Sequence, residues 1–149
     1  MKKAFLFLAL CLLGAGRAAA AEPVDSVRNV IYMIGDGMGL AHVSMLAVEG
    51  GYAPTAFDRA QGIALISTYS ANNRVTDSAA AGTALACGSK TNNGTLGLDP
   101  RGGRLQSVIE WAVAEGMPAG IAVKCHLQHA TPAAFYAHVP DRGDEKAIT

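Results

Sequence analysis

The sequence predicts an α/β protein with a doubly wound, largely parallel sheet and helices on both faces. Short apolar runs of strand length alternate with segments of helical periodicity, and glycines separate one from the next. The apolar runs are nearly continuous, as is typical of strands that are buried on both faces of a parallel sheet. Parallel strands joined through helices favour right-handed crossover connections.

Each element follows from its local pattern. Three apolar runs are expected to form strands, at residues 29–34, 63–69 and 119–123. Helices are expected where apolar residues recur on one face before a terminating glycine, at residues 40–49, 77–87 and 105–113. Shorter helices are expected around Pro132 and from residue 144, and residues 89–103, rich in Gly, Asn and Thr, predict a loop. His42 and His138 are expected on helix faces.

The first 21 residues predict a signal peptide that is removed from the mature protein. Lys2 and Lys3 precede an apolar stretch, and Ala19-Ala20-Ala21 supplies an A-x-A cleavage site before Glu22. A membrane anchor is the alternative, but Arg17 interrupts the run short of the roughly 20 residues that span a bilayer. We therefore expect a periplasmic or secreted protein without a stable membrane anchor, with its functional domain in residues 22–149.

The charge composition excludes one broad class of function. The chain has 12 basic and 12 acidic side chains among 149 residues, so its formal net charge is zero. Nucleic-acid binding through a basic face needs clustered Lys and Arg, so it is not expected as a main role. Export permits a disulfide between Cys87 and Cys125, but two cysteines serve equally well as small buried hydrophobes.

The final residues indicate that the fold is incomplete in this chain. A helix-like segment begins near Asp144 and no further strand follows it. Three strands would leave an open sheet edge, so we expect these residues to form the front part of a longer chain.

The first motif with chemical content is Gly35-Asp36-Gly37-Met38-Gly39, directly after the first apolar run. A carboxylate at the carboxyl end of a parallel strand faces the ligand crevice, where Asp36 could bind a hard cation. A dinucleotide fingerprint is less compatible, because Leu40 replaces its last glycine and Asp36 would repel pyrophosphate. A simple turn with an exposed Asp remains the alternative.

Two further motifs combine hydroxyls with charged groups. Asp77-Ser78 opens an alanine-rich helix, whose N-terminus attracts anions; Ser78 is a candidate nucleophile, although an ordinary N-cap is the alternative. Thr131 precedes Pro132 and is expected to cap the helix there. Arg142 offers a planar fork that matches phosphate oxygens, although most single arginines are simply solvated.

Together these segments resemble the alkaline phosphatase family. The matching stretches are NVIYMIGDGMG, VTDSAAAGTALACGSKTNNGTLG and HATPAAFYAHVPDR, in family order and with similar spacing. The resemblance covers the chain from Asn29 onward but only the N-terminal portion of the longer family members.

The resemblance implies roles for particular residues. Asp36 would bridge one zinc and the magnesium, Ser78 would be the zinc-bound nucleophile that forms a phosphoserine, and Thr131 would bind magnesium. Asp77 would orient Arg142, which would clamp two phosphate oxygens. His129 stands where some bacterial members have Asp and animal members have His, so it would alter the surroundings of the magnesium.

The resemblance also implies two Zn²⁺ and one Mg²⁺ as cofactors and small phosphate monoesters as substrates, and it allows a homodimer for the full-length protein. The remaining metal ligands would lie beyond Thr149, so this chain alone is expected to be inactive. Two alternatives stay open: an exported module that only binds phosphate, and a related sulfatase or phosphodiesterase. The absence of a C/S-x-P-x-R motif around Ser78 disfavours the sulfatase.

Overall fold

The computed structural model describes residues 28–149, so the predicted signal peptide lies outside the described residues. The chain divides into two compact units, residues 1–34 and residues 35–149. The described part of the first unit, residues 28–34, has no regular secondary structure. All elements discussed below belong to the second unit.

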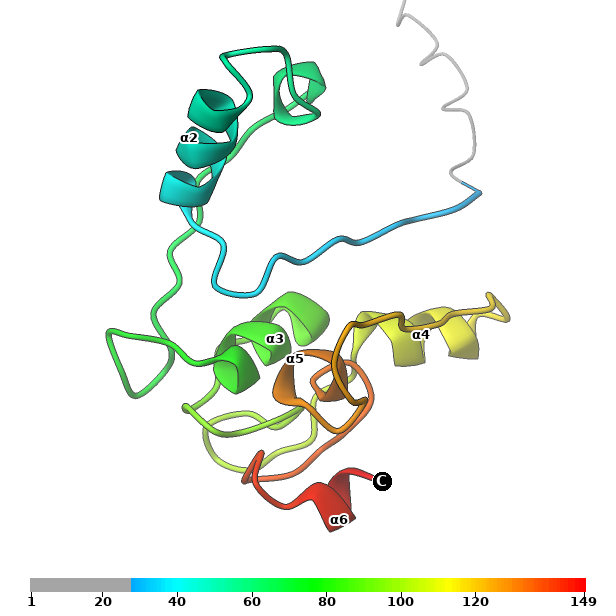
Figure 1. Ribbon diagram of the computed structural model, residues 1–149. Helices are drawn as coiled ribbons and strands as arrows, with labels where there is room; N and C mark the ends of the chain where they lie inside the picture. The colour runs from blue at the N-terminus through cyan, green and yellow to red at the C-terminus, as the bar shows by residue number, and fades with distance from the viewer. Residues whose placement is uncertain (1–27) are drawn as a thin grey trace, which may run out of the picture. The chain divides into compact units, whose positions relative to one another are not determined.

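The predicted long helices are present. α2 spans Leu40–Glu49 and α3 spans Ser78–Cys87, as the apolar periodicity and the terminating glycines indicated. α4, at Val108–Ala114, begins a turn later than predicted because Ser107 caps it: its hydroxyl accepts from the Glu110 N–H. The shorter elements are the 3₁₀ helix η1 at Phe57–Arg59, α5 at Ala130–Ala133 and α6 at Glu145–Ile148 (Figure 1).

The predicted parallel sheet is not formed by the residues that the structure describes. Residues 29–34, 63–69 and 119–123 carry no strand; within residues 28–149 only isolated antiparallel bridges occur, Leu96 with Val139 and Leu98 with Arg104. A strand requires a neighbour for its N–H and C=O groups. The apolar side chains of the first two segments are largely exposed, with Ile31 86% and Ile63 84% exposed, whereas Ile121 in the third is partly buried against the core.

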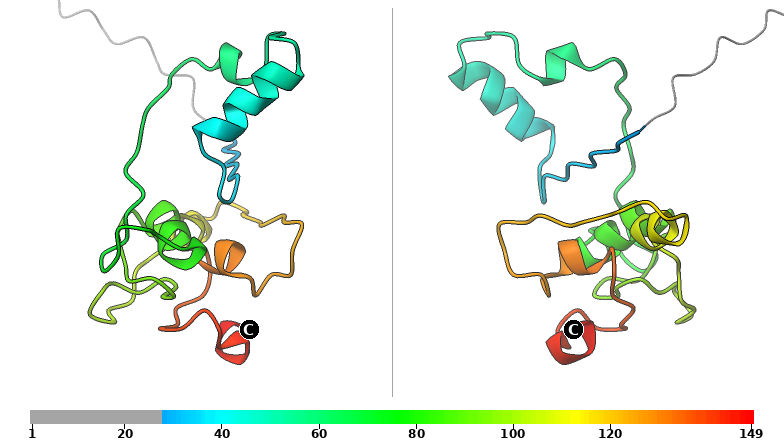
Figure 2. Two further views of the ribbon diagram at one scale, coloured as in Figure 1. Left: turned by 60° about the vertical axis from the view of Figure 1, so that its left-hand side comes forward. Right: turned by 90° about the vertical axis from the view of Figure 1, so that its right-hand side faces the viewer.

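The core of the second unit is made largely of small residues. α3 contacts both α4 and α5, and Figures 1 and 2 show α5 beside α3. The buried cluster of the second unit comprises ten apolar residues: Ala79, Ala86, Leu96, Ala130, Ala133, Ala134, Phe135, Ala137, Val139 and Ile148. Because most are alanines, the α3 and α5 backbones can approach closely.

A polar network joins α4 to the segment after α5. The Ser107 hydroxyl donates to the Phe135 carbonyl at 2.6 Å, and a Glu110 carboxylate oxygen lies 3.0 Å from His138 Nε2. Burial alone would raise the pKa of Glu110, but hydrogen bonds from Ser107 and His138 and the nearby positive charges hold it below its usual value. His138 therefore lies in a polar network outside any helix, so its predicted place on a helix face is wrong.

The two cysteines within residues 28–149 are both free in the structure. Cys87, at the end of α3, is half-buried, and burial raises the pKa of its thiol; Cys125 is exposed. Of the two interpretations left open, the disulfide is not formed here.

The close packing of α3 on α5 depends on Gly82. A Cβ at this position would lie 2.9 Å from the Ala134 Cβ and 3.6 Å from the Thr131 carbonyl oxygen. We expect Gly82→Ala to lower the free energy of unfolding by about 1–3 kcal/mol through overpacking, despite the better helix propensity of alanine.

Urea denaturation followed by circular dichroism measures this difference. Gly62→Ala is the matched control, because its Cβ would meet nothing within 4 Å, and its effect should stay within about 0.5 kcal/mol. A Gly82→Ala variant as stable as the control would contradict the proposed packing.

Candidate active site

The Gly35–Gly39 motif forms the tight turn that its glycines predict. The Met38 N–H donates to the Gly35 carbonyl at 3.1 Å, and Gly37 has φ of +68°, which favours glycine. Asp36 is held in this turn, with its carboxylate free to reach residues distant in sequence.

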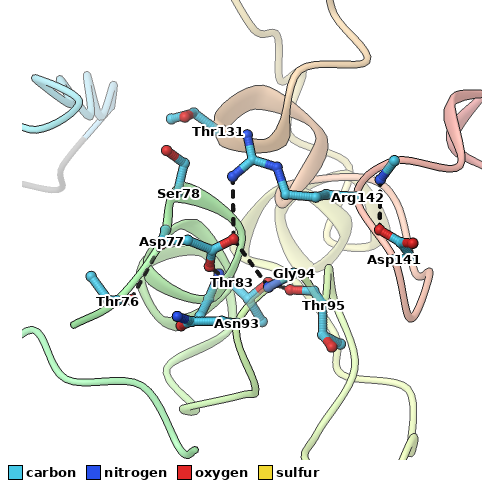
Figure 3. Close-up of polar contacts among 12 residues, drawn as sticks. Thr76, Asp77, Ser78, Thr83, Asn93, Gly94, Thr95, Thr131, Asp141 and Arg142 are labelled. Carbon is cyan, nitrogen blue, oxygen red and sulfur yellow. Dashed lines mark hydrogen bonds and ion pairs between the residues drawn. The ribbon is translucent and has the colours of Figure 1, made fainter. Parts of the chain in front are cut away.

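The N-terminus of α3 is organised by Asp77, its N-cap residue. Asp77 Oδ1 accepts from the Ala80 N–H at 2.9 Å, which satisfies one donor of the first helical turn. Asp77 Oδ2 accepts from the Gly94 N–H at 3.0 Å and from Arg142 Nη1 at 3.2 Å (Figure 3). Asp77 is thus an N-cap residue, and the same carboxylate also forms the ion pair with Arg142.

Ser78 is the first residue of α3, so its side chain lies at the positive end of the helix dipole. Its Oγ donates to the Asp36 carboxylate, 3.0 Å from Oδ2 and 3.3 Å from Oδ1. The fold therefore joins the glycine turn to the α3 N-terminus across 42 residues of sequence.

Thr131 has a different role from the predicted helix cap. α5 begins at Ala130 with His129 as its N-cap residue, so Thr131 lies inside the first turn. Its Oγ1 instead donates to Asp36 Oδ2 at 2.7 Å. The prediction that Thr131 caps the helix is wrong, because α5 starts at Ala130, before Pro132. The Thr131 hydroxyl instead joins that of Ser78 at the Asp36 carboxylate.

Arg142 is fixed at both ends. Its backbone N–H donates to the Gly94 carbonyl at 2.7 Å, and its guanidinium pairs with Asp77. The side chain remains about one-third exposed, so its fork is accessible to a ligand. In Figure 3 the Arg142 guanidinium and the Ser78 and Thr131 hydroxyls lie on the same side of Asp77.

The surroundings of Asp36 favour the charged form of its carboxylate. The hydrogen bond from Thr131 lowers the pKa of Asp36; burial opposes this, and the Ser78 hydrogen bond with the positive charges of His129 and Arg142 adds to it. Two hydroxyls and a carboxylate therefore gather beside the α3 N-terminus, supplying hard oxygen donors of the kind that Mg²⁺ prefers.

His129 lies near this oxygen cluster. Its ring makes an edge contact with the His126 ring, with centroids 5.5 Å apart. Among residues 28–149, no three His, Cys, Asp or Glu side chains are grouped closely enough to hold a metal ion. The oxygen donors that the chain brings together are those of Asp36, Ser78 and Thr131.

Sequence reasoning gave no role to Gly94, although the structure places it between Asp77 and Arg142. The Gly94 N–H donates to the Asp77 carboxylate, and the Gly94 carbonyl accepts from the Arg142 N–H. The Asn93-Gly94 pair is a turn signal that could have drawn attention to this loop, but only the fold shows which side chains the turn serves.

A hydroxyl at a helix N-terminus beside an arginine fork defines a class of site suited to phosphate-like anions. The adjoining carboxylate of Asp36 suits a hard cation. Comparison with known proteins agrees with this class. The family model described as alkaline phosphatase matches residues 27–149. The chain belongs to the alkaline phosphatase family.

Individual relatives give the extent of the similarity. Alkaline phosphatase 4 of Bacillus subtilis is 41% identical over 134 residues, which cover 83% of this chain and 29% of the relative. The cold-active alkaline phosphatase of Shewanella sp. aligns with a TM-score of 0.73 and 40% identity, over 78% of this chain and 31% of that one.

A third comparison concerns a metal. A variant of the alkaline phosphatase from the Antarctic bacterium TAB5, described as having Mg bound in the M3 site, aligns with a TM-score of 0.71 and 34% identity, over 76% of this chain and 32% of that one. These structural neighbours have the α/β alkaline phosphatase fold. The chain covers 22% of alkaline phosphatase 4 of Drosophila melanogaster and 29% of that of Bacillus subtilis, so it spans less than a third of the length of these relatives.

The contacts of Asp77 predict a graded loss of stability. Asp77→Ala removes the α3 cap and the partner of Arg142, and we expect it to cost about 1–3 kcal/mol of unfolding free energy. Asp77→Asn retains a cap acceptor and should cost less. Chemical denaturation of both variants measures the difference.

The matched control is Asp144→Ala, which removes an N-cap bond to the Ala147 N–H in α6. We expect that variant to lose no more than about 1 kcal/mol. Equal losses for Asp77→Ala and Asp144→Ala would show that the contacts of Asp77 beyond its cap contribute nothing.

Proposed function

We propose that the full-length protein carrying this chain is an exported, metal-dependent phosphate-monoester hydrolase that works through a phosphoserine on Ser78. The observation that carries the proposal is the convergence of Ser78, Asp36 and the Asp77–Arg142 pair at the N-terminus of α3. Membership of the alkaline phosphatase family supports the same reaction class.

The site has the features that binding of a phosphoryl group requires. The helix dipole and the Arg142 guanidinium supply positive potential next to Ser78, and the planar fork can meet two phosphoryl oxygens. Because Asp77 fixes one edge of the guanidinium through Nη1, we infer that the rest of the fork faces the ligand. Arginine placed in this way stabilises the charge on the equatorial oxygens of an in-line displacement.

Ser78 is the nucleophile in this proposal. Its oxygen forms a bond to phosphorus while the bond from phosphorus to the leaving alcohol breaks, and water later hydrolyses the phosphoserine to inorganic phosphate and the free hydroxyl. In the structure the Ser78 hydroxyl donates to the carboxylate of Asp36. A carboxylate, with a typical pKa of about 4, is a poor base at neutral pH, so activation by a cation is required.

The chain's own donors fit a hard cation in part. Asp36 would help to hold one zinc and the magnesium, Ser78 would hold that zinc, and Thr131 would hold the magnesium, with His129 modifying the surroundings of the magnesium. Bound metal supplies the positive charge that favours the alkoxide of Ser78 and stabilises the leaving oxygen. The magnesium in the TAB5 variant supports metal dependence. We further propose that the full-length protein binds two zinc ions, with ligands that residues 22–149 do not supply.

The remaining features of the full-length protein follow from the family. We propose that the extended segments at 29–34, 63–69 and 119–123 become strands of a doubly wound sheet in the full-length protein, as the exposed apolar side chains of the first two segments suggest. Export through the leader at residues 1–21, small phosphate monoesters as substrates and a homodimer complete the expectation. Among residues 28–149, no helix has the length and apolarity that crossing a membrane requires.

Trapping of the covalent intermediate tests the mechanism. The full-length protein, reacted with labelled aryl phosphate and quenched in acid, should carry label on Ser78. Ser78→Ala should carry none, while the matched control Ser89→Ala, at a serine outside the site, should be labelled like the wild type. The aryl phosphate should be turned over faster than a phosphate diester or an aryl sulfate.

The alternatives give different results. A module that only binds phosphate would show no label on Ser78 yet retain normal phosphate binding. A sulfatase or phosphodiesterase would turn over its own substrate as fast as the monoester, or faster. Either result would contradict the proposal.

The isolated segment, residues 22–149, should have no phosphatase activity. Its donors at the site are one carboxylate and two hydroxyls, too few for a zinc pair. Its exposed apolar segments also favour aggregation. Metal analysis and turnover measurements on the purified segment test this, and stoichiometric binding of two zincs with hydrolysis of monoesters would contradict it.

A further inference from the structure

Gly94 lies in a loop and contacts both members of the Asp77–Arg142 pair through its backbone. Its N–H donates to Asp77 Oδ2 at 3.0 Å, and its carbonyl accepts from the Arg142 N–H at 2.7 Å. Asp77 and Arg142 are themselves 3.2 Å apart. Figure 3 shows these three residues adjoining one another, with Ser78 beside Asp77 at the start of α3.

The requirement for glycine at this position is conformational. Gly94 has φ of +85°, which L side chains rarely adopt, while a Cβ here would meet nothing within 4 Å. A side chain would therefore not clash with a neighbour. It would instead drive the backbone away from the conformation that aims the N–H at Asp77 and the carbonyl at Arg142.

The segments on both sides hold Gly94 in place. On one side, the Asn93 N–H donates to Asn72 Oδ1 and its side-chain amide donates to the Val75 carbonyl, both at 2.9 Å. On the other side, Thr95 Oγ1 donates to the Pro140 carbonyl at 3.2 Å. Leu96 and Val139 then exchange backbone hydrogen bonds. The loop is thereby tied to the segment before Asp77 and to the segment before Arg142.

We propose that Gly94 is a positioning residue for phosphate binding, setting the guanidinium of Arg142 relative to Ser78 by fixing Asp77 and the Arg142 backbone at once. This inference rests on the proposed function, because it assumes that the ligand at Ser78 and Arg142 is a phosphate group. The helix cap is made by the other oxygen of Asp77 and does not involve Gly94, so the constraint from Gly94 acts on Arg142.

The test compares variants at two glycines with nearly the same φ, +85° for Gly94 and +86° for Gly102. Gly94→Ala should weaken binding of inorganic phosphate to the full-length protein about 10-fold, measured by titration calorimetry, because alanine is strained at positive φ. Gly94→Asn should bind within about 3-fold of the wild type, because asparagine tolerates this region. Gly102→Ala is the matched control: Gly102 has φ of +86° and an equally open Cβ position, in another turn, so phosphate affinity should not change.

A second measurement separates positioning from general loss of structure. In an Arg142→Ala background, Gly94→Ala should cause no further loss of phosphate affinity, because its effect acts through Arg142. Independent, additive losses would overturn the inference, as would a Gly94→Ala variant with wild-type affinity or a wild-type protein that binds no phosphate.

The two proposals fail separately. Phosphate binding does not depend on turnover, so wild-type protein that traps no label on Ser78 but shows the expected Gly94 effects would overturn the phosphoserine mechanism and leave the positioning role standing. If Ser78 carries label but Gly94→Ala does not change phosphate affinity, the positioning role is overturned and the phosphoserine mechanism stands.

Discussion

The described part of the site depends on the carboxylate of Asp77. One of its oxygens caps α3 through the Ala80 N–H, and the other accepts from the Gly94 N–H and from Arg142. A buried or half-buried carboxylate is stabilised by such donors, and each of them fixes a different segment of chain. Removal of this group would free the helix start, the loop and the arginine together.

The small side chains of α3 and α5 set the second constraint. Because Gly82 faces Ala134, the two helices approach closely enough for α5 to present Thr131 to Asp36. The contact from Thr131 spans 95 residues of sequence, and that from Ser78 spans 42. The alanine-rich composition of α3 thus follows from the need to bring hydroxyls and a carboxylate together, as well as from helix propensity.

Local patterns predicted the helices well, whereas the described residues do not form the predicted sheet, for a physical reason. α2 and α3 end where glycines stop their periodicity, which is information held within each segment. Strands depend on partners elsewhere in the chain, and the apolar runs at 29–34 and 63–69 are extended and exposed here. Thr131 and Gly94 show the same limit at the site: the contacts of Thr131 with Asp36 and of Gly94 with Asp77 arise from tertiary packing, which no spacing rule encodes.

The central claim is that the N-terminus of α3 and Arg142 form one phosphate site. A crystal structure of the full-length protein with inorganic phosphate tests it most directly. We expect a phosphate with one oxygen facing Ser78 Oγ and two oxygens on the Arg142 guanidinium, while Asp77 keeps its contacts with Ala80 and Gly94. Phosphate bound elsewhere, with Arg142 turned away from Ser78, would contradict it.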